Sequence, residues 1–196
     1  MADARNRQNV IVGAPNIKAS GGLLMGPVVK EGLPTDATSE LNAATLKLKP
    51  AGFIAQDGIT KTVDRSTEKI KDWANDTIIV VETDHTVTVK FSFYEAINTA
   101  VLEAVFGKDN VTVSDTSVAV ADAAGETPHQ TFIAEMNGGE GKKARVVIPD
   151  GQITSVGDIV YKKDEPVRYE VEIECFADKN GKKFYAYYEK PAADAA

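Results

Sequence analysis

Residues that commonly do chemistry are scarce in this sequence. It has two histidines, His85 and His129, and one cysteine, Cys175. Each histidine has acidic neighbours along the chain, but a metal site usually needs three or four converging ligands with a second shell of hydrogen bonds. A single cysteine excludes an intrachain disulfide and a cysteine-based zinc site. The sequence therefore predicts no metal centre and no cofactor, and we expect the protein not to be an enzyme.

The glycine-rich segment "NGGEGKK" at 137–143 has part of the composition of a phosphate-binding loop. Its spacing differs from that motif, because position 136 is a methionine and Lys143 stands where a serine or threonine must bind magnesium. We interpret the segment as a hairpin turn. The segment "DKNG" at 178–181 begins like a calcium loop, but the rest of the loop, including its closing glutamate, is missing.

Composition limits the class of protein. The 196 residues are 43% hydrophobic and carry a net charge of −7, enough for one globular domain with a proper core. Proteins that hold nucleic acid tightly are usually basic, because phosphate neutralisation supplies much of their affinity. The polar N-terminus and the lack of a long apolar run predict neither a signal peptide nor a membrane helix. We expect a soluble protein made in a cytoplasm.

The elements that position these residues are mostly strands. "HTVTVKFSFY" at 85–94 alternates apolar and polar residues, which predicts a half-buried antiparallel strand, and "VRYEVEIECF" at 167–176 alternates in the same way. "TIIVVE" at 77–82 is a continuous apolar run, which is typical of a strand buried on both faces. Apolar residues at helical spacing predict one helix over about 95–106, ended by Gly107.

Turn signals separate the remaining strands. They include Gln56–Gly58, the prolyl turn 149–151 and Asn180–Gly181. The predicted fold is mainly β, an antiparallel sandwich or barrel with one flanking helix and long loops or arms. We predict an N-terminal arm at 1–22 with a short strand at Val10–Val12, a β domain at 23–190 and a flexible tail at 191–196.

Two long segments do not fit one compact core. Residues 30–50 show no periodicity, and an irregular stretch of that length is uncommon inside a compact domain, where it is usually functional or disordered. The segment 64–77 reads as a charged loop, yet it contains Trp73, the only tryptophan. Such a side chain either clamps the loop base against its own sheet or anchors a contact with another subunit. The candidate subunit-interface residues are Trp73, Ile70, Lys71, Asp72, Leu33, Leu41 and Leu46.

Two predicted strands carry polar outer faces. One has an acidic row, and the other is mostly neutral; either is a surface that a passing polyanion would not bind. The candidate residues are Glu170, Glu172 and Glu174 on the first strand, and Thr86, Thr88, Lys90 and Ser92 on the second. The alternative interpretation is a solvated face that discourages aggregation.

The stretch from Gly52 to Gly107 resembles the central region of major tail proteins, the tail-tube subunits of long non-contractile-tailed phages. The similarity lies in an ordered series: "GFIAQDG", a charged loop with a tryptophan, the strand "TDHTVTVKFSFYE" and a short amphipathic helix ending in glycine. The resemblance implies a tail-tube type of β fold and stacked hexameric rings. Their lumen would conduct DNA without holding it tightly.

The same resemblance implies location in the virion tail, with synthesis in the host bacterial cytoplasm. It implies contacts with other copies of the chain and with tape-measure, terminator and tail-tip proteins, and none with a membrane. An inner-tube protein of a contractile tail or secretion system is an alternative. A small β-barrel that binds a ligand or glycan is another, and it would use Tyr185, Tyr187 and Tyr188.

Overall fold

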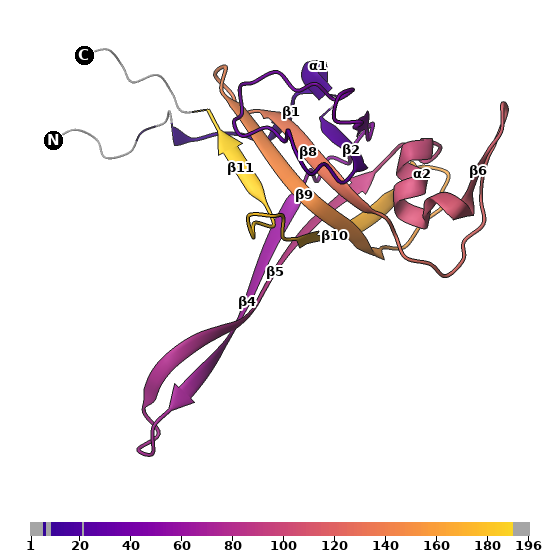
Figure 1. Ribbon diagram of the computed structural model, residues 1–196. Helices are drawn as coiled ribbons and strands as arrows, with labels where there is room; N and C mark the ends of the chain where they lie inside the picture. Colours follow the sequence, from indigo (N-terminus) through magenta and orange to yellow (C-terminus); the bar gives the residue numbers. More distant parts are fainter. Residues whose placement is uncertain (1–5, 7–8, 21, 190–196) are drawn as a thin grey trace, which may run out of the picture.

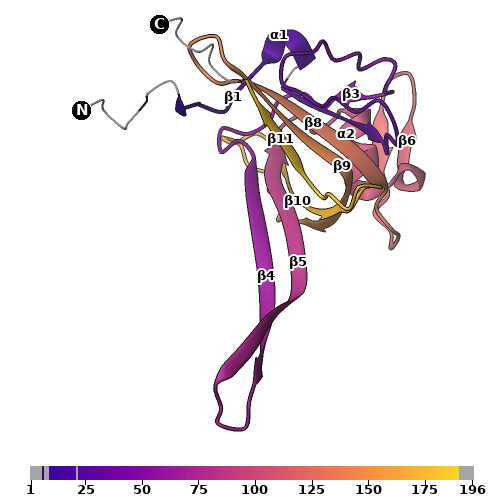
Figure 2. The same cartoon turned by 60° about the vertical axis from the view of Figure 1, so that its left-hand side comes forward.

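The computed structural model describes residue 6 and residues 9–20 and 22–189, and it consists of a β body with a long two-stranded arm (Figures 1 and 2). Among the described residues, nine strands join in one antiparallel sheet. Its order is β3 (Lys49–Pro50), β2 (Leu23–Pro27), β8 (His129–Asn137), β9 (Lys143–Val156), β10 (Tyr169–Phe176), β5 (Thr77–Phe93) and β4 (Thr60–Lys71). In addition, β1 (Ala14–Pro15) pairs with β8, and β11 (Tyr185–Tyr188) pairs with β9.

The other elements are short. A separate ribbon pairs β6 (Val111–Val113) with β7 (Val118–Val120), and the helices are α1 (Ile17–Ser20), α2 (Thr99–Phe106) and the 3₁₀ turn η2 (Lys108–Asn110).

The prediction of a mainly β, antiparallel fold with one flanking helix is confirmed, and the sheet is not a closed barrel. The predicted strand at Val10–Val12 is absent; the first pairing in the described residues is that of Ala14 and Pro15 with β8. The predicted tail at 191–196 lies outside the described residues.

The main core lies between the curved sheet and α2. The alternation predicted for 85–94 is confirmed, since Val87, Val89, Phe91 and Phe93 are all buried. Beside them on β10, the buried side chains are Tyr169, Val171, Ile173 and Cys175. The helix covers these strands with Val101, Leu102, Ala104 and Val105. The strand side of this core therefore follows from the alternation of apolar and polar residues, and the helix side follows from the helical spacing of apolar residues in α2.

The helix begins later than its periodicity predicts. Asn98 is its N-cap, and its side chain accepts a hydrogen bond from the Ala100 N–H. Before it, the Glu95 carboxylate accepts from the Asn98 side chain at 2.9 Å and from the Phe53 N–H at 3.2 Å, so residues 95–98 form a turn. Ile97, which fits the helical spacing, lies outside the helix and is 84% exposed.

One predicted turn and one predicted hairpin are wrong. The prolyl segment 149–151 lies inside β9, where the Pro149 carbonyl accepts a hydrogen bond from the Thr131 hydroxyl at 2.7 Å. The strand passes this point beside a register shift in β8, which is where a sheet tolerates proline. A Cβ at Gly151 would come within 2.8 Å of the Ile173 side chain, so close strand packing requires this glycine. At Gln56–Gly58 the chain turns, but only Ile54 forms a bridge, with Phe93, instead of a hairpin.

The segment 30–50 packs on the body. Its apolar side chains cover a second, smaller cluster on the opposite side of β8 and β9 from α2, made of Leu24, Leu48, Ile133 and Val147. Arg145, only 2% exposed, holds the segment in place. Its guanidinium pairs with Glu135 and also donates to the carbonyls of Asp36, at 2.8 Å, and Ser39, at 2.7 Å.

Replacing Arg145 tests this anchor. We expect Arg145→Met to lower the free energy of unfolding by about 3–5 kcal/mol, because it leaves the Glu135 carboxylate buried without its partner. The double variant Arg145→Met, Glu135→Leu recovers most of that loss, since both charges are then removed. Urea denaturation measures both values. Equal destabilisation of the single and double variants would show that the ion pair is not the source of the effect.

Candidate assembly surfaces

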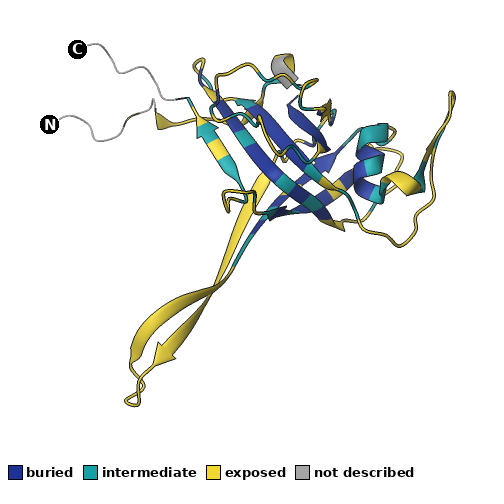
Figure 3. Cartoon of the chain, in the orientation of Figure 1, coloured by how far each residue is buried: buried dark blue, intermediate teal, exposed yellow. Residues whose placement is uncertain are grey.

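The two-stranded arm formed by β4 and β5 is the most exposed part of the described structure. Past Thr62 and Thr88 the strands β4 and β5 pair only with each other and extend away from the sheet (Figures 1 and 2). Every residue from Thr60 to Asp84 is exposed, and Figure 3 shows the arm as one continuous exposed feature. The predicted loop 64–77 is therefore wrong: it is two strands joined by a turn at Asp72–Asp76.

The apolar run 77–82 forms the outer part of β5. Ile78, Ile79, Val80 and Val81 are 62%, 52%, 55% and 43% exposed, so the prediction of a strand buried on both faces is wrong for the isolated subunit. Successive side chains of a strand point to opposite faces, so the outer part of β5 is apolar on both faces, while β4 places Glu68 opposite Val81 and Lys69 opposite Val80. Apolar surface of this size on an isolated ribbon is typical of a contact surface.

A bulge changes which side chains share a face. Ser66 pairs with Asp84 but Thr67 pairs with Glu82, which leaves Thr83 as an extra residue in β5. Beyond the bulge, Ile79 pairs with Ile70. The arm is therefore a twisted continuation of the body sheet whose composition changes from polar to apolar.

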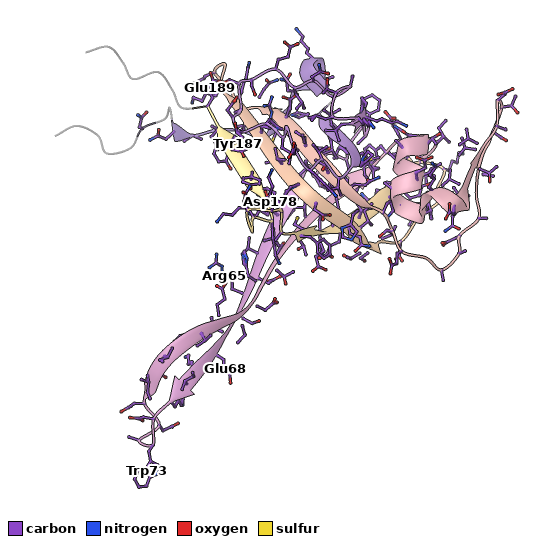
Figure 4. The ribbon with its side chains drawn as sticks, viewed as in Figure 1. Arg65, Glu68, Trp73, Asp178, Tyr187 and Glu189 are labelled. Carbon is purple, nitrogen blue, oxygen red and sulfur yellow. The ribbon has the colours of Figure 1, made fainter. Side chains whose placement is uncertain are left out.

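The tip of the arm is a hydrogen-bonded turn that presents Trp73. The Asp72 N–H donates to the Asp76 carbonyl at 2.9 Å, and the Asp76 N–H donates to the Asp72 carboxylate at 2.8 Å. Lys71 donates to the Asn75 side chain at 3.0 Å. The indole of Trp73 is 104% exposed and lies at the far end of the arm (Figure 4). The alternative in which Trp73 clamps the loop base against its own sheet is therefore wrong.

The predicted interface residues fall in two places. Ile70, Lys71, Asp72 and Trp73 lie together on the outer arm. Leu33, Leu41 and Leu46 instead lie in the segment 30–50 and are half-buried against the smaller cluster of their own subunit. The structure thus gives these leucines an internal contact, and their role between subunits stays a prediction.

The structure joins the two predicted polar faces into one. In the β5–β10 pairing, Ser92 lies opposite Glu170, Lys90 opposite Glu172, and Thr88 opposite Glu174. The same face continues onto β4 with Thr60, Thr62 and Asp64, and onto β9 with Gln152 and Ser155. Ser92 is only 6% exposed, so its predicted place on an open polar surface is wrong. We call the other residues of this set, with Thr86, the polar face. The sequence missed the β4 and β9 members because their short polar runs have no acidic row to mark them.

The polar face is acidic. Lys90 is paired with Glu172 at 2.9 Å, and the hydrogen bond and charge of Glu172, with the charge of Glu170, raise the pKa of Lys90. Lys90 therefore stays protonated, and its charge is matched by Glu172. Glu170, Glu174 and Asp64 leave the face with net negative charge, as a surface that repels polyanions requires.

Tyrosines of β11 line a cleft. The rings of Tyr185 and Tyr187 are stacked, with centroids 5.9 Å apart and 8° between planes. Both border a cleft of about 680 Å³ between the segment 28–35 and the turn 177–180. Tyr188, named with them as a candidate ligand-binding residue, is on the other face of the strand and is 61% exposed.

The histidine, the cysteine and the glycine-rich segment considered in the sequence make contacts that stabilise the fold. His129 pairs with Asp150 at 2.6 Å and contacts the Phe176 ring. Cys175 is buried, and burial raises the pKa of its thiol to about 12. The glycine-rich segment is a hairpin turn between β8 and β9, as predicted. Within residues 6, 9–20 and 22–189, no group of three or more His, Cys, Asp or Glu side chains is placed to hold a metal, and no helix is long and apolar enough to cross a membrane.

Comparison with known proteins gives one family. The sequence profile described as phage tail tube protein matches residues 4–196. Proteins of curated function show no match to the chain. Among solved structures, the cryo-EM structure of the anti-feeding prophage cap (AFP tube terminating cap) matches with a TM-score of 0.43 and 8% sequence identity. That match covers 96% of this chain and 100% of the other.

The exposure of the indole makes a direct prediction for the isolated subunit. We expect Trp73→Ala to change the free energy of unfolding by less than about 0.5 kcal/mol, as for surface positions without internal contacts. Phe93→Ala, at a fully buried position, is the control and costs about 3–5 kcal/mol. Chemical denaturation of the monomer measures both. A loss comparable to that of Phe93→Ala would mean that Trp73 packs within its own subunit.

Proposed function

The chain belongs to the phage tail tube protein family and is a structural protein of the virion tail, and from this premise we propose that it is the repeating subunit of the tube itself. Copies form hexameric rings, and the rings stack into a hollow tube that conducts DNA during ejection. The observation that carries the proposal is the arm, which exposes the apolar side chains of Ile70 and of residues 78–81 in the single subunit.

The free energy available from one arm is modest. Fully burying an isoleucine or valine side chain stabilises by about 1.5–3 kcal/mol, so half-exposed ones contribute roughly 1 kcal/mol each. Ile70 and the four residues 78–81 then supply about 5 kcal/mol, and Trp73 adds to this. Association itself costs an estimated 4–15 kcal/mol. A single arm contact is therefore marginal, which favours a closed ring where each subunit gives one contact and receives another.

The geometry of the contact also favours rings and stacks. The arm protrudes from one edge of the body, and in the proposed ring it packs on the body of the next copy, so the two surfaces in contact are different. Such head-to-tail contacts close into rings when the rotation closes, and they propagate as filaments when it does not. Both arrangements occur together in a stacked tube.

We assign the polar face to the lumen. It lies on the side of β5 and β10 opposite the α2 core, and its acids outnumber its one paired lysine in the residues named above. DNA binding depends on phosphate neutralisation by basic side chains. An acidic lining offers none, so a duplex passes without being held.

The remaining partners follow from the same proposal. Tape-measure, terminator and tail-tip proteins are the expected contacts inside and at the ends of a tail tube. We place the chain in a long non-contractile tail, and an inner tube of a contractile tail or secretion system is the alternative. A sheath gene beside the gene for this chain would favour that alternative.

A charge on the arm tests the assembly. We expect Ile79→Lys to leave the subunit folded and to abolish rings and tubes, because the new ammonium group must be desolvated in the contact. Size-exclusion chromatography and negative-stain microscopy at high concentration give the readout. Val113→Lys, which makes the same kind of change at an exposed strand residue of β6 away from the arm, is the control and assembles normally. A wild-type protein that stays monomeric at every concentration and is absent from virions contradicts the proposal.

Reversing charge on the polar face tests the lumen assignment. We expect Glu170→Lys with Glu174→Lys to preserve tubes, whereas double-stranded DNA is then retained inside them in a salt-dependent way. The matched control is Asp109→Lys with Asp115→Lys, which makes the same charge change beside α2. Equal DNA retention by both double variants would place the polar face outside the lumen.

A further inference from the structure

The tyrosine cleft is a built aromatic site with no assigned role. One wall is the segment 28–35, the other is formed by Tyr185, Tyr187 and the turn 177–180, and Val147 and Pro149 also line it. Its volume of about 680 Å³ lies within the range of clefts that enclose a sizeable organic group. The lining combines apolar and aromatic side chains with charged ones, which favours an aromatic occupant that also offers a hydrogen-bond donor; the charged residues are Lys30, Glu31, Asp150, Asp178 and Lys179.

The aromatic wall is held rigidly. Tyr185 donates a hydrogen bond to the Asp178 carboxylate at 2.6 Å, and that carboxylate also accepts from the N–H groups of Asn180, at 2.8 Å, and Lys182, at 3.0 Å. The hydrogen bond from Tyr185, ahead of those from the turn, lowers the pKa of Asp178. The turn, the carboxylate and the stacked rings therefore form one preorganised unit, which lowers the entropic cost of binding.

The chain itself carries a side chain that fits this site. Trp73 is fully exposed, and burying an indole removes a large apolar surface from water while its N–H seeks an acceptor. Asp150 lines the cleft; one of its carboxylate oxygens pairs with His129, and the other offers an acceptor for the indole N–H. Both surfaces carry charges of either sign: Lys71, Asp72 and Asp76 flank Trp73 in the sequence, and the cleft lining includes Lys30 and Lys179 beside Glu31, Asp150 and Asp178. Ion pairs can form across the contact, while its net charge does not drive it.

The Trp73 of one subunit cannot reach its own cleft. The turn after β10 packs at the base of the arm, where Lys183 donates a hydrogen bond to the His85 carbonyl and Lys61 lies over the Phe184 ring. Arg65, the partner of His85, is six residues from Lys71, so the tip is roughly 20 Å from the base at about 3.3 Å per residue. Figure 4 shows Asp178 beside the base and Trp73 at the far end.

We propose that Trp73 of one copy inserts into the cleft of a second copy, between the stacked tyrosines and the segment around Leu33. This inference rests on the proposed tube and names the surface that receives the arm. Because the cleft lies at the base of the receiving copy's own arm, successive copies are offset by roughly one arm length. The contact is head-to-tail, and repetition propagates it from copy to copy.

Cross-linking between two kinds of subunit tests the contact. Ala74→Cys places a thiol beside Trp73, and Ala177→Cys places one at the exposed edge of the cleft. We expect a short bismaleimide to join Ala74→Cys subunits to Ala177→Cys subunits. The control pairs Ala74→Cys with Ala119→Cys on the distant β7, and its cross-linking yield is at least 10-fold lower. Native Cys175 is buried and stays as it is.

Fluorescence gives an independent readout, because Trp73 is the only tryptophan. We expect its emission to shift to shorter wavelength and its quenching by acrylamide to fall when tubes form. Ala177→Arg, which obstructs the cleft, raises the concentration needed for assembly by roughly 30-fold, the effect of losing a hot-spot aromatic contact. Ala186→Arg, on the opposite face of β11, is the matched control and assembles normally.

The outcomes separate this inference from the proposed function. Tubes that form with unchanged Trp73 emission and background cross-linking at Ala177 overturn the cleft contact and leave the tube proposal standing. A wild-type chain that never assembles overturns the tube proposal. In that case, cross-linking of Ala74→Cys to Ala177→Cys at high concentration still decides whether the tip binds the cleft.

Discussion

The two halves of the 17-residue strand β5 need different surroundings. In the body its odd-numbered side chains from Val87 to Phe93 are buried under α2, and the facing side is polar. Beyond the body both faces are apolar, and none of the described residues covers either one. Because a two-stranded ribbon has little stability of its own, the arm depends on the body for its direction. In the proposed tube, other copies bury its apolar side chains.

The body determines the direction of the arm. The inner half of β5 is paired on both sides, with β4 and with β10, and it is packed against the α2 core. The turn after β10 adds contacts at the arm base through Lys183 and Phe184. Because the inner half of β5 is held in this way, the core sets the direction in which the outer half extends and therefore the position of its tip.

The second core cluster shapes the cleft that we propose receives the tip of the arm. Arg145 and Glu135 hold the segment 30–50 against β8 and β9 through the carbonyls of Asp36 and Ser39. This attachment closes one wall of the tyrosine cleft at 28–35. A buried ion pair is weak evidence for stability in general. Here its geometric effect is specific, because it positions a long segment that has no regular secondary structure for most of its length.

The sequence by itself determined the class of fold, the half-buried strands, the helix and the acidic row, because those features follow from local periodicity and turn chemistry. It also identified 77–82 as a strand with two apolar faces and Trp73 as a side chain needing a contact. Only the tertiary structure decided that this strand leaves the body, that Glu170, Glu172 and Glu174 share one face with Thr88, Lys90 and Ser92, and that the tyrosines of β11 meet the segment 28–35. The physical reason is that periodicity specifies which faces of a strand are apolar. Which surface covers each face depends on strand order and register between residues distant in the chain.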